Sequence, residues 1–251
     1  LLVPKPPNNL LTILSILWYV AVIIWISRTL ETILILELMN KFYTKSKSPF
    51  TPRVFKDLNP EGIKIFTFHS GFKKKNTDLL IIIFDNKQNV ACKYSLTSTP
   101  SAPIIWDKKY NKGACKALIV NSGNANAHTG KKGVKNIEKY VNALCKYIKC
   151  SKKEILVSST GVIGEDLNPN LIINKIKLLN KSKEKSFVDA AKSICTTDTY
   201  VKTSDHNLII DRQNIKIYGF AKGSGMIHPN MGTMLAYIFI VCEVSPKVLK
   251  K

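Results

Sequence analysis

Short apolar runs separated by polar stretches dominate the chain from Gly62 onward. Three of these runs are bounded by polar residues and are typical of buried strands: residues 79–84 (LLIIIF), 117–121 (ALIVN) and 155–158 (ILVS). Residues 208–211 and 215–218 flank Arg212-Gln213-Asn214 and predict a hairpin with a three-residue turn.

Other stretches have the spacing of amphipathic helices. Apolar residues recur every three or four positions from Val134 to Ile148, which predicts a helix opened by Gly133 and closed near Lys149. A second helix is expected over residues 171–179, after an Asn-Pro pair that suits a cap and a first turn. A third is expected over 187–194, capped by Ser186. The pattern therefore predicts a mixed α/β fold without internal repeats.

The first part of the chain has a different character. Residues 10–26 are almost entirely apolar, but seventeen residues are at the short limit for crossing a bilayer, and Thr12 and Ser15 interrupt them. We expect residues 1–47 to be an N-terminal extension and residues 48–61, which contain three prolines, to be a linker. A membrane anchor and a buried helix remain the alternatives for the extension.

Charge changes this picture little. The chain of 251 residues has a formal net charge of +21, but only three of its 38 basic residues are arginines. Arginine's planar fork is the side chain best suited to reading phosphates and bases. We therefore do not expect a nucleic-acid partner, although a non-catalytic, membrane-anchored protein that binds polyanions stays open as an alternative.

Six cysteines are scattered along the chain, without a CxxC pair or a zinc-like Cys/His spacing. Cys145 and Cys150 are five positions apart, a spacing that does not bring two side chains together on a helix. We expect free thiols and no metal site.

Candidate chemistry lies in three segments rich in Gly, Ser, Thr and Asn, each expected to be a loop that follows a strand. They cover residues 121–130, 158–164 and 221–235. Loops of this composition bring backbone N–H groups close to a ligand, so the residues by themselves predict a small-molecule site.

Four motifs together indicate more. VNSGNAN (120–126), SSTGVIG (158–164), TTDT (196–199) and AKGSGMIHPNM (221–231) resemble, in order and spacing, the motif set of the ornithine acetyltransferases. These are the bifunctional glutamate N-acetyltransferases of arginine biosynthesis, or ArgJ family, and the likeness runs from about Gly62 to the C-terminus. The resemblance implies the layered α/β fold of self-cleaving ArgJ/DmpA-like enzymes.

It also implies a cleavage site and a nucleophile. Members of the family cut themselves before a threonine that becomes the nucleophile, here Thr233, and the bond cut is Gly232–Thr233, where the family usually has alanine in place of Gly232. The freed α-amine, whose reference pKa is about 7.7–8.0, can serve as the base for the hydroxyl. Residues 62–232 then correspond to the family's first subunit and residues 233–251 to the start of its second.

The remaining site residues follow from the same motifs. Thr160 and Gly161 match the oxyanion hole, and Thr196 and Lys222 match residues that bind substrate, with Lys222 expected on a loop after the hairpin. Asp198 is expected to orient its loop through its side chain.

The implied reaction is acetyl transfer from N-acetylornithine to glutamate through an acetyl-threonine intermediate, with acetyl-CoA as a second donor in bifunctional members. No resident cofactor is expected, and the two fragments of the precursor would form a heterotetramer in the cytoplasm. Family chains continue beyond this sequence with further substrate-binding residues, so we expect this chain alone to be inactive. A related self-cleaving threonine amidohydrolase, which transfers the acyl group to water, is the alternative enzyme.

Overall fold

The computed structural model describes residues 59–210, 212–223 and 234–249. The chain divides into two units, Leu1–Arg53 and Val54–Lys251, and every described residue belongs to the second. The expected extension (1–47), most of the expected linker (48–61), and both Gly232 and Thr233 lie outside the described residues.

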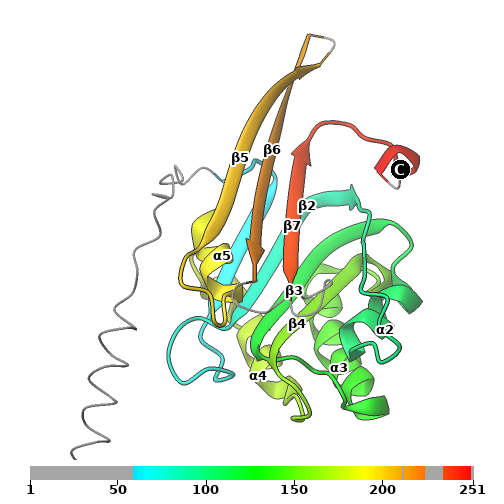
Figure 1. The fold of residues 1–251 in the computed structure, drawn as a ribbon, viewed down its shortest axis with the longest axis vertical. Coiled ribbons are helices and arrows are strands. Elements are labelled where there is room, and N and C mark those ends of the chain that lie inside the picture. Colours follow the sequence, from blue (N-terminus) through cyan, green and yellow to red (C-terminus); the bar gives the residue numbers. More distant parts are fainter. Residues whose placement is uncertain (1–58, 211, 224–233, 250–251) are drawn as a thin grey trace, which may run out of the picture. The chain divides into compact units, whose positions relative to one another are not determined.

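A four-stranded sheet forms the centre of this unit, in the order β1-β2-β3-β4 (Figure 1). β1 pairs antiparallel with β2 and β2 antiparallel with β3, whereas β3 and β4 are parallel. The connection between the parallel pair carries a helix, as such a crossover requires. The strands are β1 (Ile63–Phe68), β2 (Leu79–Asn89), β3 (Ala114–Asn124) and β4 (Ile155–Val162).

Helices α2, α3 and α4 cover one face of this sheet. Alternate residues of the strands, such as Ile81 and Ile119, pack there with Trp106, Ile137 and Leu144 of the helices, all at most 1% exposed. The helical elements of this layer are α2 (Ala102–Tyr110), α3 (Gly130–Ile148) and α4 (Pro169–Ile176), with short 3-10 turns at Lys152–Glu154 and Leu179–Lys181.

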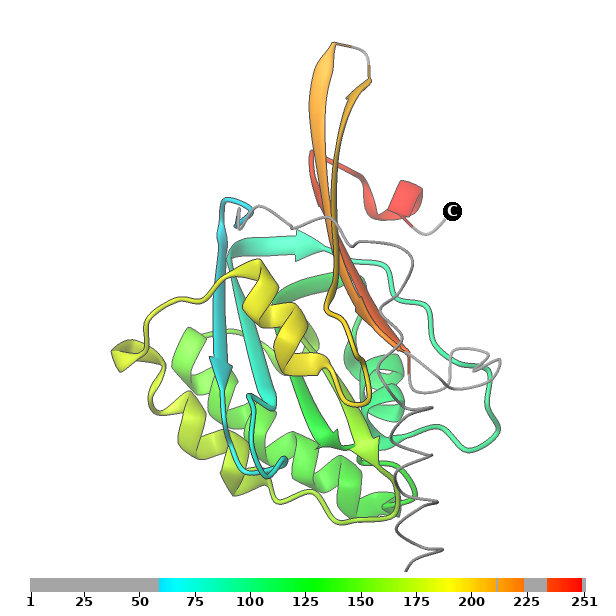
Figure 2. The ribbon, with the colours of Figure 1, turned by 60° about the vertical axis from the view of Figure 1, so that its left-hand side comes forward.

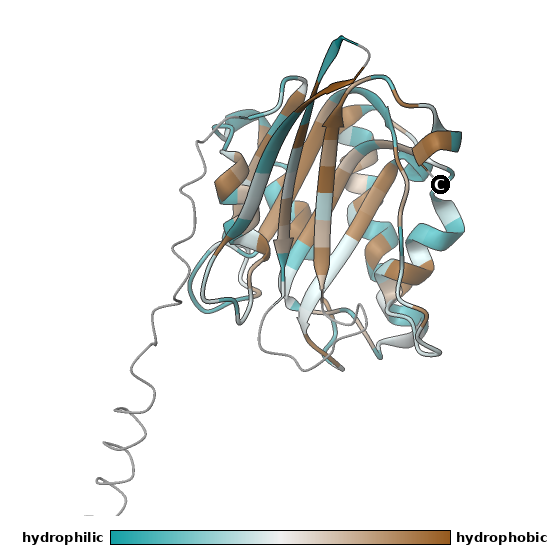
Figure 3. Cartoon of the chain, turned by 45° about the horizontal axis from the view of Figure 1, so that its top comes forward, coloured by the Kyte–Doolittle hydropathy of each residue, from teal (hydrophilic) through white to brown (hydrophobic). Residues whose placement is uncertain are grey.

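The other face packs against helix α5 (Phe187–Ile194) and a second sheet, as the turned view shows (Figure 2). The Phe187 ring meets Phe220 edge-on, with the ring centroids 5.1 Å apart. The second sheet is fully antiparallel and consists of β5 (Lys202–Ile210), β6 (Gln213–Lys222) and β7 (Leu235–Val241), followed by the short helix α6 (Pro246–Leu249). Apolar residues concentrate along the four-stranded sheet and β7, whereas β5 begins with polar residues (Figure 3).

The sequence pattern found most of these elements but not their ends. The three predicted strands each extend beyond their apolar run, and α3 begins at Gly130 rather than Gly133. Helix α4 runs from Pro169 to Ile176, so it ends before the predicted residue 179; residues 177 and 178 form a turn and Leu179 begins a 3-10 helix. In the hairpin, Ile210 pairs with Gln213, so the turn has two residues and the predicted three-residue turn is wrong. β1, α2 and β7 were not predicted.

Across the described ranges, none of the helices combines the length and apolar character that spanning a bilayer requires.

Candidate active site

Thr160 and Gly161 lie within β4 and not in a loop after it, which corrects the expectation from their composition. β3 and β4 continue to pair there, with Ser122 opposite Thr160 and Gly123 opposite Gly161. At Gly161 the φ angle is +134°, and a Cβ atom would come within 2.3 Å of the Gly123 carbonyl carbon. Only glycine fits this approach of two backbones.

Thr196 and Lys222, separated by 26 positions, are brought into direct contact. The Lys222 Nζ donates a hydrogen bond of 3.0 Å to the Thr196 Oγ1. Lys222 is the last residue of β6 rather than part of a loop, and it is buried, whereas Thr196 is exposed after the end of α5. Burial lowers the pKa of Lys222, and the nearby Asp198 carboxylate partly offsets this effect. The pair places the hydroxyl of an exposed residue against a buried cation.

Asp198 fixes the backbone around that pair. Its Oδ1 accepts hydrogen bonds from the Gly223 N–H (2.8 Å) and the Lys202 Nζ (2.7 Å), and its Oδ2 accepts one from the Thr196 N–H (3.3 Å). Burial raises the pKa of Asp198, but the hydrogen bonds from Lys202, Gly223 and Thr196 outweigh burial and leave that pKa below its ordinary value. The carboxylate therefore stays ionised and accepts hydrogen bonds from all three of these groups.

Ser122 connects the two groups of predicted residues. It neighbours Thr160 across the β3–β4 pair, and its Oγ donates a 2.5 Å hydrogen bond to the Ser193 carbonyl at the end of α5. The chain then leaves α5 and reaches Thr196 three residues later. The strand end with Thr160 and Gly161 is thus bonded to the segment that carries Thr196.

Sequence reasoning did not single out Lys73 and Asp78, which lie in the loop between β1 and β2. Lys73 bonds to the Cys195 carbonyl of this same segment, and Asp78 bonds to Lys73 and Ser122. Lys73 is one lysine among many, and Asp78 stands just before an apolar run as any turn residue would. Their roles depend on contacts with residues more than 40 positions away, so no local pattern identifies them.

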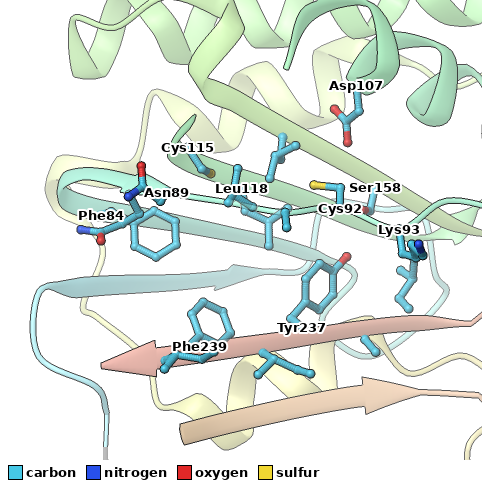
Figure 4. A pocket seen from close by; sticks show the side chains of 18 of the residues that line it. Phe84, Asn89, Cys92, Lys93, Asp107, Cys115, Leu118, Ser158, Tyr237 and Phe239 are labelled. Carbon is cyan, nitrogen blue, oxygen red and sulfur yellow. The ribbon is translucent and has the colours of Figure 1, made fainter. Parts of the chain in front are cut away.

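A separate cavity of about 920 Å³ opens between β7 and the face of β3 and β4 (Figure 4). Phe84, Leu118 and Phe239 give it a largely apolar lining, and the Asp107 carboxyl lies at one side. None of Thr160, Gly161, Thr196 and Lys222 lines this cavity. Among the described residues there is also no cluster of three or more His, Cys, Asp or Glu side chains placed to hold a metal ion.

Comparison with known proteins decides the family. A profile described as "ArgJ family" matches residues 64–251, three quarters of the chain. The chain belongs to the ArgJ family. Curated ArgJ relatives named "arginine biosynthesis bifunctional protein ArgJ" include one from Bartonella henselae, 38% identical over 192 residues, which are 75% of this chain and 47% of the relative. Another from Rhizobium meliloti is 38% identical over 82% of this chain and 51% of the relative.

Solved ArgJ structures share the fold. An ArgJ structure from Bacillus halodurans aligns with a TM-score of 0.62 and 32% identity over 70% of this chain and 92% of that one. An ornithine acetyltransferase from Mycobacterium tuberculosis, solved in complex with ornithine, aligns with a TM-score of 0.60 and 25% identity over 68% of this chain and 92% of that one. Both the resemblance drawn from the four motifs and the predicted α/β fold class are confirmed.

The chain spans only about half the length of these curated ArgJ relatives.

Proposed function

We propose that this chain contributes the oxyanion hole and one substrate-binding wall of an enzyme that transfers acetyl from N-acetylornithine to glutamate in arginine biosynthesis. The observation that carries the proposal is the contact between Lys222 and Thr196, because a buried cation beside an exposed hydroxyl suits the carboxylate that both amino acids share. The ornithine bound to the M. tuberculosis relative supports a substrate of this class.

The proposed cycle starts with self-cleavage. The Thr233 hydroxyl attacks the Gly232 carbonyl carbon, the peptide becomes an ester, and water hydrolyses the ester to leave the Gly232 carboxylate and a free Thr233 amine. Support comes from chain lengths: solved relatives are 92% covered by this chain, whereas curated relatives are about half covered. The solved chains are therefore much shorter than the curated sequences, as cleavage near the middle would make them.

Acetyl transfer then uses the same hydroxyl. The α-amine of Thr233 takes the hydroxyl proton as the oxygen attacks the acetyl carbonyl of N-acetylornithine, and ornithine leaves with a proton on its amine. Thr160 and Gly161 stabilise the negative oxygen of the tetrahedral intermediate. The α-amine of glutamate next attacks the acetyl-threonine ester, which releases N-acetylglutamate and restores Thr233. No resident cofactor takes part, and acetyl-CoA would be a second acetyl donor.

The proposed assembly joins the two fragments of the precursor in a cytoplasmic heterotetramer. Family membership favours acetyl transfer over a polyanion-binding protein, for which the chain shows only its charge.

The experiment follows cleavage and acetyl transfer in a polypeptide that has the full length of the relatives. On a denaturing gel the wild type should give two fragments, the second beginning at Thr233, while Thr233→Ala should remain one chain and Thr99→Ala should be cut normally. Cleavage of the Thr233→Ala variant at the same bond would show that the nucleophile is another residue.

Incubation of the cut protein with N-acetylornithine separates the two enzyme classes. A transferase forms N-acetylglutamate, and its turnover rises when glutamate is added. An amidohydrolase releases acetate at a rate that glutamate does not change, and that result would replace the proposal by the alternative.

A further inference from the structure

We propose that Lys73 is a positioning residue of this site: it holds the Cys195–Thr196 peptide group so that the Thr196 hydroxyl stays against Lys222. The expected effect on substrate binding rests on the proposed function. The hydrogen-bond geometry of Lys73 does not depend on that function.

The ammonium of Lys73 donates to three backbone carbonyls. Its Nζ lies 2.6 Å from the Cys195 oxygen, 3.2 Å from the Ser193 oxygen and 3.1 Å from the Thr77 oxygen. An ammonium has three donors, so all three are engaged. Two of the acceptors belong to the end of α5, where carbonyls lack helical partners and a cation is favoured by the helix dipole.

One peptide group is therefore held from both sides. The carbonyl of Cys195 is bonded to Lys73, and the N–H of the same peptide, which belongs to Thr196, is bonded to the Asp198 Oδ2 at 3.3 Å. The C=O and N–H of a trans peptide point in opposite directions, so these two bonds fix the orientation of its plane. Fixing that plane fixes the Cα of Thr196 and limits the positions its hydroxyl can take relative to Lys222.

Lys73 is itself held by a buried carboxylate. Asp78 is fully buried, and its Oδ2 accepts hydrogen bonds from the N–H groups of Lys73 and Gly71, both at 3.0 Å, while its Oδ1 accepts one from the Ser70 N–H at 2.6 Å. The Asp78 carbonyl also accepts the Ser122 N–H at 2.8 Å. The loop that carries Lys73 is thus attached to the strand that pairs with Thr160.

Electrostatics agrees with this geometry. Burial lowers the pKa of Lys73, Lys222 lowers it further, and Asp78, Cys195 and Asp198 act in the opposite direction. Lys73 and Lys222 thus both lie near Thr196, together with the ionised Asp198 that accepts the Thr196 N–H. All three N–H donors of the Lys73 ammonium bond to backbone carbonyls, so Lys73 affects the substrate indirectly, by positioning Thr196.

The test compares Lys73→Met with Lys75→Met, a neighbouring exposed lysine, in the full-length enzyme. We expect Lys73→Met to raise the KM for N-acetylornithine roughly 10-fold, the effect of one lost hydrogen bond to a charged group, with kcat nearly unchanged. Lys75→Met should match the wild type. A purely structural role would lower the amount of active enzyme and hence the apparent kcat, without changing KM, and that result would overturn the proposal.

A double-mutant cycle tests whether Lys73 affects KM through Thr196. If Lys73 acts through Thr196, then Lys73→Met should change KM little in the Thr196→Ala background. Equal fold-changes in both backgrounds would overturn the proposal. If Lys73→Met fails to fold, Lys73→Arg takes its place: it keeps the charge but not the convergence of three donors, and a wild-type KM for this variant would also overturn the proposal.

Hydrogen–deuterium exchange separates this inference from the proposed function. In the 251-residue chain without substrate, the segment 193–199 should exchange faster in Lys73→Met than in Lys75→Met. Equal exchange would overturn the positioning role even if acetyl transfer is observed. Faster exchange in an enzyme that does not turn over N-acetylornithine would leave the role intact and reject the proposed function.

Discussion

At the scale of single residues, the proposed site depends on how closely the surrounding atoms pack at Thr160 and Gly161. Thr160 is 3% exposed and lies near the C-terminal end of β4. Gly161 follows it where the backbones of β3 and β4 come so close that a Cβ atom has no room. A buried hydroxyl held on a strand rather than a loop is pre-oriented, and pre-orientation is what an oxyanion donor needs.

Thr160→Ala is accordingly expected to lower kcat by about 10²–10³ while leaving KM nearly unchanged, because the hydrogen bond strengthens mainly in the transition state. Steady-state kinetics of the full-length enzyme measures the effect, with Thr160→Ser as the control that keeps a hydroxyl. An increase confined to KM would instead assign Thr160 to substrate binding.

At the scale of secondary-structure elements, the way α3 ends explains a thiol contact that the sequence spacing did not predict. Lys149 adopts a left-handed conformation (φ 54°, ψ 53°) as the C-cap, and the Cys150 N–H bonds back to the Cys145 carbonyl. The chain therefore reverses, and the Cys150 Sγ lies 3.9 Å from the Cys145 Sγ. The expectation that a five-residue spacing keeps these side chains apart is wrong, because it assumed that the helix continues.

Lys149→Gly should raise the free energy of unfolding by about 0.5–1 kcal/mol, since glycine adopts this conformation without steric cost. Urea unfolding followed by circular dichroism measures the change. Lys146→Gly, in the exposed last turn of the same helix, should lower stability by about 1 kcal/mol. A loss of stability in both variants would contradict the argument.

Strong local patterns made some elements predictable, and weak ones left others unseen. Helix α5 was predicted with its bounds and its cap, because Ser186 and the Ser186–Asp189 capping box are local signals. β1 (IKIFTF) mixes polar with apolar positions, and β7 was obscured by the small-residue segment before it. The motifs pointed to Thr196 and Lys222, but Lys73 and Asp78 act through tertiary contacts, which no short pattern encodes.

At the scale of the whole described unit, one buried acid couples stability to pH. Burial raises the pKa of Asp107 well above its ordinary value, and a hydrogen bond from the Val157 N–H opposes the shift only in part. Between the unfolded pKa, about 3.9, and the raised folded pKa, the folded state binds more protons than the unfolded one. Stability from this group is therefore present below pH 3.9 and is lost as pH rises through the folded pKa.

Asp107→Asn should make the free energy of unfolding less dependent on pH, and its advantage over the wild type should grow as pH rises from the unfolded pKa towards the raised folded pKa. Urea titrations at several pH values measure this, with the exposed Asp205→Asn as control. Parallel pH profiles for wild type and Asp107→Asn would contradict the assignment.

Deletion of residues 1–47 tests the boundary expected from the sequence. We expect the shortened protein to unfold at the same temperature as the intact chain and to cleave and transfer acetyl normally at full length. Deletion of residues 1–61 should lower stability by about 1 kcal/mol, because it removes Asn59, whose side chain bonds the Phe187 N–H (2.8 Å) and the Lys185 carbonyl (3.1 Å) at the start of α5. Aggregation of the shorter deletion, or retention of the intact chain by alkali-washed membranes, would show that the segment has another role.

The distribution of the site along the sequence has a consequence for the timing of maturation. Ser122, Thr160 and Lys222 lie on three different strands and Thr196 on the segment after α5, so the strand pairing and hydrogen bonds that link them form only when both sheets and α5 are in place. Contacts this distant in sequence require loop closure before they can form, so they are slow to form. A cut at Gly232–Thr233 that depends on this arrangement would act as a checkpoint, leaving misfolded copies as inert precursors and releasing the reactive amine only in molecules that have completed folding.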